Sequence, residues 1–254
     1  MEIITINSKN INTYDLCLIK NTQADGYIAK STWIKAELKN GLVIKRAINE
    51  RGETMGFIEY IPIENAWRAV KGKNYFFIHC VFTYPKKYQG QNIGTKLIQG
   101  CIDDANKSKK DGVAVIATKN SFMANKQIFE KMNFREIEEY NKHQLLVFKF
   151  NKKSVFPKLM DIDSSLKQYN GIHLFYSNQC PALAKPVKEI LNECEKQKIK
   201  ITTHFINAST DAQNAPFISG TFGVVYNRKV YAERCISKTR FFNIIKQQRS
   251  GSNK

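Results

Sequence analysis

The sequence lacks both a long apolar run and a Cys-x-x-Cys pair. No stretch approaches the roughly 18 apolar residues that a membrane span requires. The N-terminal segment MEIITINSKN also lacks the basic-then-apolar pattern of a secretory signal. The 6 cysteines are widely spaced and mostly lie in apolar stretches, as buried thiols in a reducing compartment do. We therefore expect a cytoplasmic protein with no membrane contact, no disulfides and no metal site.

Acidic residues are scarce relative to basic ones, and the chain of 254 residues carries a net charge of +18. The excess is spread over both halves of the chain rather than gathered in one basic arm. Such a charge attracts polyanions and anionic cofactors. A lysine-rich soluble surface explains it equally well, so nucleic-acid binding stays open and is not favoured.

A break in the pattern of apolar segments divides the chain. The segment 151–171 contains Pro157, Gly171, a pair of lysines and a Ser-Ser pair, and it separates two apolar strands. We therefore predict a first domain at 1–151, a linker at 152–170 and a second domain at 171–250.

The first domain has the pattern of a mixed α/β fold. The segments NYFFIHCVF (74–82) and GVAVIAT (112–118) are continuous apolar runs, typical of strands buried on both faces. Apolar residues recur at helical spacing from Leu97 to Ala105. The expected strands cover 2–6, 41–49, 54–62, 74–82, 112–118 and 143–150, and the expected helices cover 26–38, a segment starting at Thr95, and 121–134.

The stretch YQGQNIGTKLI, beginning at Tyr88, is an uncharged polar loop that leads directly into a helix. A loop that presents backbone N–H groups at a helix N-terminus can bind phosphate, because those groups have no partner within the helix. Small residues such as Gly94 let the main chain approach the phosphate. Asn92 is among the few non-glycine residues that tolerate a left-handed conformation.

A buried strand, this loop with its Gln-x-x-Asn-x-Gly pattern, and an amphipathic helix together resemble motif A of the GNAT family of N-acetyltransferases. The resemblance covers nearly all of residues 1–150 and implies a GNAT-type mixed α/β sheet that binds acetyl-CoA. Asn92 departs from the family pattern, since it stands at the first glycine position. The resemblance assigns cofactor binding to Val81, Phe82, Thr83, Gln89, Gly90, Gln91, Asn92, Ile93, Gly94 and Thr95.

Acyl transfer to an amine requires a base, an oxyanion stabiliser and an acid for the leaving thiolate. The family often uses a tyrosine as the acid, but Phe129 stands at that position here. We therefore consider Glu59, His79 and Tyr84 as catalytic candidates. Each has a structural alternative: Glu59 as an exposed strand residue, His79 as a hydrogen-bonded core histidine, and Tyr84 as a packing tyrosine. Trp67 and Arg68 either form a wall of the acceptor pocket or anchor the surface.

The second domain reads strand, polar turn, helix, strand, hairpin and helix. Cys180 stands where the first helix begins, and the hairpin turns at Asn227 and Arg228. This order resembles a smaller thioredoxin/glutaredoxin-like α/β domain. In that resemblance CPAL corresponds to the glutaredoxin Cys-Pro-x-Cys, and Pro216 to the cis-proline of the fold. The segments YSNQCP and NAPF…GTF resemble the YoaP-type domain attached to some bacterial acetyltransferases.

A thiol at a helix N-terminus has a lowered pKa and is nucleophilic, which makes Cys180 a candidate reactive thiol. Leu183 stands where a resolving cysteine would be, so two-thiol exchange within this motif is excluded. The alternative is a degenerate domain kept for binding or dimerisation.

The leading hypothesis is an enzyme, an N-acetyltransferase that moves an acetyl group from acetyl-CoA to an amine, with a second domain that shapes the acceptor pocket. A non-catalytic CoA- or nucleic-acid-binding protein and a monothiol redox protein using Cys180 are the alternatives. The acceptor remains open among small amines, peptide termini, lysines, aminoglycosides and tRNA bases. A homodimer also remains open.

Overall fold

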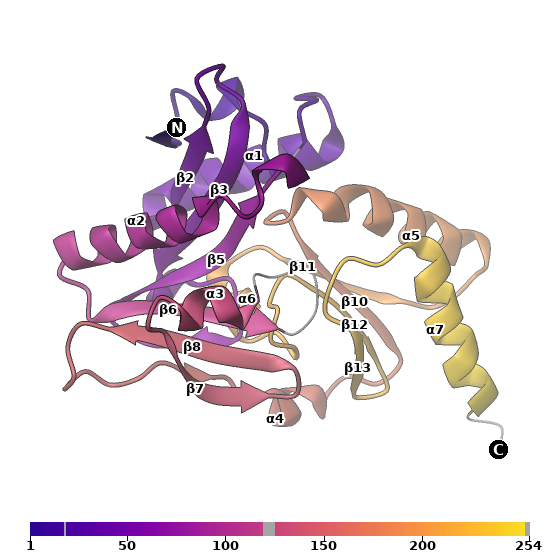
Figure 1. Ribbon diagram of the computed structural model, residues 1–254. Helices are drawn as coiled ribbons and strands as arrows, with labels where there is room; N and C mark the ends of the chain where they lie inside the picture. Colours follow the sequence, from indigo (N-terminus) through magenta and orange to yellow (C-terminus); the bar gives the residue numbers. More distant parts are fainter. Residues whose placement is uncertain (18, 119–124, 252–254) are drawn as a thin grey trace.

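A seven-stranded mixed sheet forms the first half of the protein in the computed structural model, which describes residues 1–17, 19–118 and 125–251 (Figure 1). Its strands in spatial order are β1 (Glu2–Thr5), β2 (Val43–Ile48), β3 (Thr54–Pro62), β5 (Tyr75–Thr83), β6 (Gly112–Thr118), β8 (His143–Lys149) and β7 (Arg135–Tyr140). Neighbouring strands are antiparallel except β5 and β6, which are parallel.

Three helices and four short 3-10 helices accompany this sheet. They are α1 (Asp25–Glu37), α2 (Ile93–Lys107), α3 (Lys126–Glu130), η1 (Ile11–Thr13), η2 (Leu38–Asn40), η3 (Ile63–Asn65) and η4 (Lys86–Tyr88). The strands expected in this half are confirmed with ends shifted by two residues at most, and α2 begins two residues before Thr95. The helix expected at 121–134 is shorter at its C-terminal end, because Asn133 turns the chain with a φ of 65°. Its positions 121–124 lie outside the described residues.

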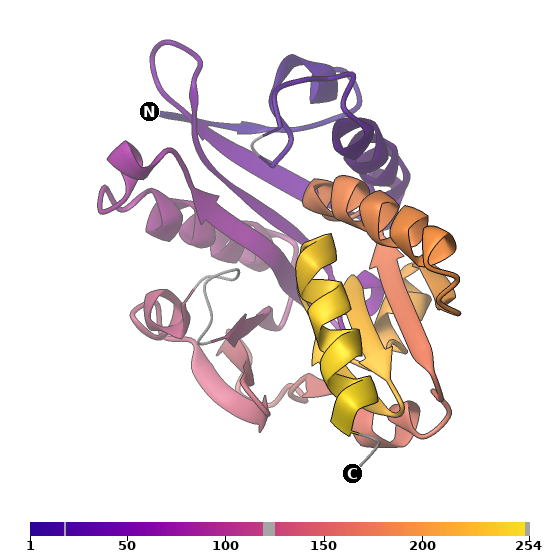
Figure 2. The ribbon, with the colours of Figure 1, turned by 90° about the vertical axis from the view of Figure 1, so that its right-hand side faces the viewer.

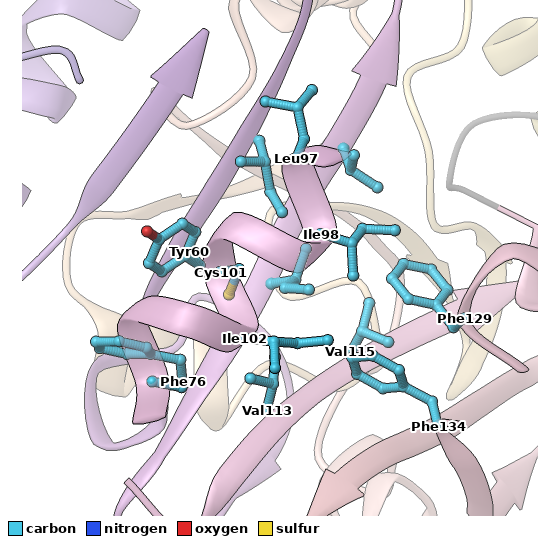
Figure 3. Packing of buried hydrophobic residues seen from close by; sticks show 14 of the residues in the cluster. Tyr60, Phe76, Leu97, Ile98, Cys101, Ile102, Val113, Val115, Phe129 and Phe134 are labelled. Carbon is cyan, nitrogen blue, oxygen red and sulfur yellow. The ribbon is translucent and has the colours of Figure 1, made fainter. Parts of the chain in front are cut away.

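Helix α2 covers one face of the sheet through its apolar side (Figure 3). Leu97, Ile98 and Cys101 repeat at the spacing that places side chains on one helical face, and all three are fully buried. They pack against Tyr60 of β3 and Val115 of β6. Each fully buried apolar side chain contributes about 1.5–3 kcal/mol to folding, so this face fixes α2 on the sheet.

A second sheet of four strands forms the other half (Figure 2). Its strands in spatial order are β11 (Thr202–Ile206), β10 (Ile172–Ser177), β12 (Phe222–Tyr226) and β13 (Lys229–Ala232), and its helices are η5 (Pro181–Leu183), α5 (Ala184–Lys196), α6 (Ser209–Gln213) and α7 (Lys238–Gly251). β10 and β11 are parallel, while β12 is antiparallel to both β10 and β13. The hairpin turns at Asn227 and Arg228, both with positive φ, as predicted.

Pro216 is a correction to the sequence-based prediction. In the described residues the cis peptide bond is Tyr84–Pro85, so the bond before Pro216 is trans. Pro216 lies well before β12, in a loop that still has to turn through Gly220 at a φ of 63° before the strand begins at Phe222. Pro216 therefore follows a trans peptide bond and lies apart from the start of the strand, so it does not correspond to the cis-proline of the thioredoxin-like fold.

The two halves share one hydrophobic core. Trp33 of α1 packs edge-to-face on Trp67 at a ring distance of 5.4 Å. The same buried cluster includes Phe175 of β10 and Phe217. The expected linker 152–170 is not a free connection either, since it forms β9 (Lys158–Leu159), which pairs with β4 (Val70–Lys71), and α4 (Ile162–Leu166). The second half is thus held against the first by buried apolar surface.

Candidate functional site

Strands β5 and β6 separate halfway along their length. They pair only from Tyr75–Ile78 on β5 to Gly112–Val115 on β6, although β5 continues to Thr83 and β6 to Thr118. On its other side β5 stays paired with β3 as far as Thr83. Beyond Ile78 the edge of β5 that faces β6 therefore has no partner in β6, and its N–H groups there are not used by that strand.

A cavity of about 330 Å³ opens at this separation, and both halves of the chain line it. Phe57, Val81 and Phe82 contribute apolar walls from the first half, and Leu183 and Phe222 contribute them from the second. The polar and thiol-bearing lining residues are Cys17, Lys30, Glu59, Arg68, His79, Cys80, Gln179, Cys180, Ser219, Thr221, Glu233, Arg234 and Cys235.

A β-bulge places His79 in the wall of this cavity. Glu59 of β3 pairs with Cys80, whereas the next residue, Tyr60, pairs with Ile78, so His79 is the extra residue on β5. A bulge of this kind locally bends the strand and redirects side chains. It brings His79 beside Glu59 although the two residues are not direct partners in the ladder.

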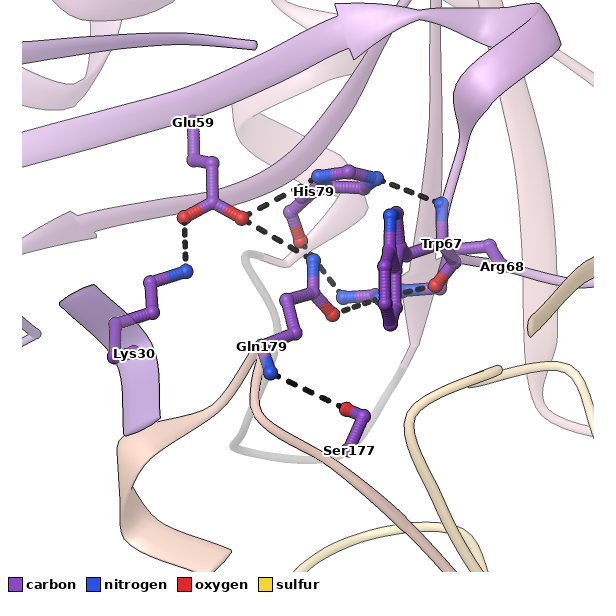
Figure 4. A network of polar contacts seen from close by, with 7 residues as sticks. All are labelled: Lys30, Glu59, Trp67, Arg68, His79, Ser177 and Gln179. Carbon is purple, nitrogen blue, oxygen red and sulfur yellow. Dashed lines mark hydrogen bonds and ion pairs between the residues drawn. The ribbon is translucent and has the colours of Figure 1, made fainter. Parts of the chain in front are cut away.

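Glu59 is the centre of a buried polar network (Figure 4). Its Oε2 atom lies 2.5 Å from Nζ of Lys30 on α1. Its Oε1 atom accepts a 3.2 Å hydrogen bond from Nε2 of Gln179, which lies between β10 and η5. Burial alone would raise the pKa of Glu59, but the Lys30 charge and the His79 contact hold that pKa at about 2. Glu59 is therefore an ion-paired carboxylate and a weak base.

His79 is neutral in this network. The backbone N–H of Trp67 donates to Nε2 at 2.9 Å, so the ring proton resides on Nδ1. Nδ1 lies 3.3 Å from Oε1 of Glu59 and makes no well-formed hydrogen bond among the described residues. Burial lowers the pKa of His79 to about 4, against the smaller opposing effect of Glu59. Both nitrogens face protein atoms, which leaves neither free to accept a proton.

Tyr84 lies apart from the other two catalytic candidates. It follows the end of β5, is 46% exposed and stacks on Phe82 at a ring distance of 6.2 Å. Its own surroundings are a different hollow, lined also by Tyr88 and Asp15. The structure therefore brings Glu59 and His79 together in the cavity and does not bring Tyr84 to them. Phe129 is fully buried and also lines the cavity, without a hydroxyl.

The predicted phosphate loop has the geometry of an anion site. Asn92 adopts the left-handed conformation, with a φ of 59°, and makes no side-chain cap to α2. The first bond within the helix runs from the N–H of Lys96 to the carbonyl of Asn92 at 3.0 Å. The preceding N–H groups of the first turn, at Ile93, Gly94 and Thr95, thus have no helical acceptor. No acidic residue stands in that turn.

The other predicted cofactor residues lie along a path from this loop into the cavity. A side-chain atom on Gly94 would lie 3.7 Å from Oγ1 of Thr83, so the end of β5 adjoins the start of α2. From Thr83 the strand passes through Phe82 and Val81, both of which line the cavity. Gln89, Gly90 and Gln91 are exposed on the loop. These residues fit an extended ligand with phosphates at α2 and its far end in the cavity.

The structure does not give Cys180 the lowered pKa that the sequence suggests. Cys180 precedes the short helix η5, and α5 begins only at Ala184, so its thiol does not stand at an α-helix N-terminus. Although the residue is exposed at the cavity mouth, the protein around its thiol desolvates it and raises its pKa. The neighbouring thiol is Cys235, whose Sγ donates to the carbonyl of Ala182 at 3.4 Å.

Sequence reasoning missed Lys30, Gln179, Cys17 and Cys235 as cavity residues. Lys30 had a readable signal, since it lies at i+3 from Tyr27 and i−4 from Ile34 and thus on the apolar face of its helix. Gln179 had no such signal in the sequence, because its partners come from distant parts of the chain. Arg68 does form a wall of the cavity, as one of its two interpretations proposed.

Among the residues that the structure describes, no group of three or more His, Cys, Asp or Glu side chains is arranged to hold a metal ion. No helix within the same residues combines the length and apolarity that crossing a membrane would take.

A strand edge that β6 leaves unpaired, an uncapped helix beside it and an open cavity at its far end together suit an acyl-CoA-dependent transferase. Residues 12–134 match the family model described as "Acetyltransferase (GNAT) family", so this segment of the chain is similar to N-acetyltransferases that use acetyl-CoA. The chain is also similar along nearly its whole length to a Bacillus subtilis (strain 168) protein described as an uncharacterized N-acetyltransferase, YoaP. The two are 26% identical over 248 residues, which cover 95% of this chain and 97% of that one.

Two solved structures are similar to part of the chain. A GNAT acetyltransferase from Staphylococcus aureus Mu50 is 19% identical, covers 59% of this chain and 99% of its own, and superposes with a TM-score of 0.43. The Escherichia coli GNAT protein YhbS, in complex with CoA, is 13% identical, covers 58% of this chain and 80% of its own, and has a TM-score of 0.41.

Proposed function

We propose that this N-acetyltransferase acetylates the amine of a small acceptor inside the cavity between its two halves. The observation that carries the proposal is the separation of β5 from β6 beyond Ile78, which joins the uncapped start of α2 to the cavity. Five residues of β5, from Thr83 to His79, span about 13 Å at about 3.3 Å per step. An extended pantetheine arm lying along this edge would carry the thioester to the cavity.

The residues present fit acetyl-CoA. The free N–H groups of Ile93, Gly94 and Thr95 and the positive end of the α2 dipole favour a pyrophosphate. The absence of an acidic residue from the first turn leaves that attraction unopposed. When bound, the cofactor would supply the activated acetyl group. The unpartnered N–H groups of β5 would hold the arm and stabilise charge on the thioester oxygen.

The reaction balances without an external co-reactant. The nitrogen of a neutral amine attacks the thioester carbon, the N–C bond forms, the C–S bond breaks, and the proton released from nitrogen ends on the thiolate of CoA. Glu59 and His79, with pKa values of about 2 and about 4, take up little of that proton near neutral pH. They instead hold the cavity wall in place. We infer that only those acceptor molecules react whose amine is already unprotonated in solution.

The second half supports the proposal as a cover on the acceptor side. Its order of strand, helix, strand, hairpin and helix, and its sheet order β11-β10-β12-β13, support the thioredoxin-like assignment. The domain boundaries at 151 and 171 belong to the same proposal. The raised pKa of Cys180 does not favour the redox alternative, so the second half is assigned the role of shaping the pocket.

The test is release of CoA from acetyl-CoA in the presence of a panel of small amines, read with a thiol reagent and confirmed by the mass of the product. We expect a gain of one acetyl group on at least one small amine. Acetyl-CoA that binds but is never consumed, with amines of every charge class, would contradict the proposal and favour a non-catalytic CoA-binding protein.

A further inference from the structure

Arg68 is a buried cation that no carboxylate within residues 1–17, 19–118 and 125–251 pairs with directly. Its side chain lines the cavity, and the residue is only 8% exposed. Nη1 donates to the carbonyl of Trp67 at 2.6 Å and to Oε1 of Gln179 at 2.7 Å, and Nη2 donates to the carbonyl of His79 at 3.1 Å. All three acceptors are neutral groups. Nε has no acceptor among the described residues.

The carboxylates that line the cavity already have other partners. Glu59 pairs with Lys30 at 2.5 Å. Glu233 lies 3.1 Å from Nε2 of His143 and accepts from the N–H of Ile218 at 3.0 Å. Glu59 reaches Arg68 only through the side chain of Gln179. A buried guanidinium in this position is costly unless a counter-ion is supplied, and burial lowers the pKa of Arg68 accordingly.

We propose that Arg68 binds a carboxylate of the acceptor, so that the acceptor is a small apolar amino acid or a similar amino-carboxylate. The proposal rests on the proposed function, because it names the substrate class of that site. Nε and Nη2 share one edge of the guanidinium, and Nε–H has no acceptor among the described residues, so this edge matches the two oxygens of a carboxylate.

The rest of the cavity suits the same class of molecule. Phe57, Leu183 and Phe222 provide apolar contact for a side chain. The volume of about 330 Å³ lies near the small end of ligand pockets, which run from roughly 300 to 1,000 Å³, and it admits one amino acid rather than a folded chain. A carboxylate on Arg68 would leave the amine free to face the end of β5.

The experiment compares matched pairs of acceptors: L-leucine, L-methionine and L-phenylalanine, each against its primary amide. The α-ammonium group of an amino-acid amide has a lower pKa than that of the free amino acid, so a larger fraction of the amide carries a neutral α-amine. Amine protonation alone would therefore favour the amide. We expect the free acid to have the higher kcat/KM by about tenfold to 100-fold, the range for a charge-assisted hydrogen bond made or lost.

The variants separate a role in recognition from a role in folding. Arg68→Gln is expected to bring the acid-to-amide ratio below one, toward the preference for the amide that amine protonation alone gives, and Arg68→Lys, which keeps the charge, is expected to retain part of the wild-type preference for the acid. Arg228→Gln is the control, since Arg228 is exposed on the hairpin and should keep the full ratio. Acetyl-CoA binding by calorimetry shows that each variant is folded.

Equal rates for acid and amide in the wild type, or an unchanged ratio in Arg68→Gln, overturn this inference and leave the acetyltransferase function standing. The comparison in the wild type decides the matter even where Arg68→Gln does not fold. Acetylation of no amine of any kind would instead overturn the proposed function, and the inference with it.

Discussion

Gln179 and Glu59 are joined by a 3.2 Å hydrogen bond, although 120 positions separate them in the chain. The amide of Gln179 also accepts from Arg68 at 2.7 Å, so one neutral side chain from the second half connects a buried anion with a buried cation of the first. Both charged groups line the cavity. The second half therefore takes part directly in the electrostatics of the site.

Replacing this glutamine should damage acceptor use more than cofactor binding. Gln179→Ala removes one buried hydrogen-bond partner from Glu59 and one from Arg68, which costs about 1–3 kcal/mol of stability. If a similar free energy is lost in positioning the acceptor, kcat/KM for the acceptor should fall at least about tenfold. The Kd for acetyl-CoA should stay within a factor of two of the wild-type value. Steady-state kinetics and calorimetry measure the two quantities.

Gln197→Ala is the matched control, because Gln197 makes a similar amide-to-carboxylate bond to Glu193, at 2.8 Å, on the exposed surface of α5. It should leave both quantities unchanged. A Gln179→Ala enzyme with normal acceptor kinetics would show that the bridge has no part in acceptor binding.

Negative charge at the start of α2 should abolish acetyl-CoA binding. Gly94→Glu adds bulk and charge where the free N–H groups would meet a pyrophosphate, and we expect at least a 100-fold loss of affinity by calorimetry, roughly 2.7 kcal/mol. Gly100→Glu makes the same chemical change later in the same helix, where the added carbon would lie 3.8 Å from Nζ of Lys45. That control should bind normally.

Gly94→Ala isolates the steric part of the effect, because its added carbon would lie 3.1 Å from Ile128, tighter than an ordinary contact. We expect a smaller loss for this variant than for Gly94→Glu. Retained binding in Gly94→Glu would place the phosphates elsewhere.

Stability should fall as pH decreases from 6.5 to 4. In this range the side chain of His79 becomes protonated in the unfolded chain, whereas burial holds its pKa in the folded protein at about 4. The unfolded state thus binds more protons, and the shift corresponds to roughly 3 kcal/mol lost across the range. Below about pH 4.5, protonation of Glu59 in the unfolded chain continues the trend, since its folded pKa is about 2.

Urea unfolding at pH 7, 5.5 and 4.5, with wild type and His79→Gln side by side, measures this dependence. Glutamine keeps an acceptor for the N–H of Trp67 but does not titrate, so the variant should show a shallower slope. Identical slopes would mean that His79 is protonated in the folded protein.

Cys180 should react slowly at neutral pH. Its pKa is raised by its surroundings, so the rate of alkylation by iodoacetamide should climb steadily through pH 9 with no plateau below it. Mass spectrometry of the alkylated peptides distinguishes Cys180 from Cys235, whose pKa is also raised, to about 11. A plateau below pH 8 would restore the reactive-thiol hypothesis for Cys180.

The strands of the first sheet were largely predictable because most of them are short apolar runs with clear ends. Strand β7 was not, because its sequence REIEEY is mostly exposed and charged, and only pairing with β8 holds it in the sheet. The helix α6 is five residues long and lacks a periodic apolar face, and it was missed for the same reason. The local sequence pattern identifies helices and strands that have an apolar face to bury. Elements without such a face form only through contacts with other segments, which the local pattern does not show.

The site divides in the same way. The loop from Gln89 to Thr95 was predictable because its chemistry is local: small residues, no charge and a helix directly after it. Glu59 and His79 were identified by residue type, but their protonation could not be read from the sequence. Burial and the charge of Lys30 help to set it, and Lys30 arrives from a helix 29 positions before Glu59. Gln179, which hydrogen-bonds Glu59, arrives from a loop 120 positions later.

The core around Trp33 and Trp67 also bears on how such a chain can change over generations. Phe175 and Phe217 of the second half cover these indoles, so a recombination event that passed on only the first 151 codons would deliver a polypeptide with an uncovered aromatic surface. Exchange of the second half for an unrelated one would do the same unless the newcomer offered matching rings. Each half therefore depends on the other to bury its aromatic surface, and substitutions at their seam can reshape the cavity without uncovering these rings.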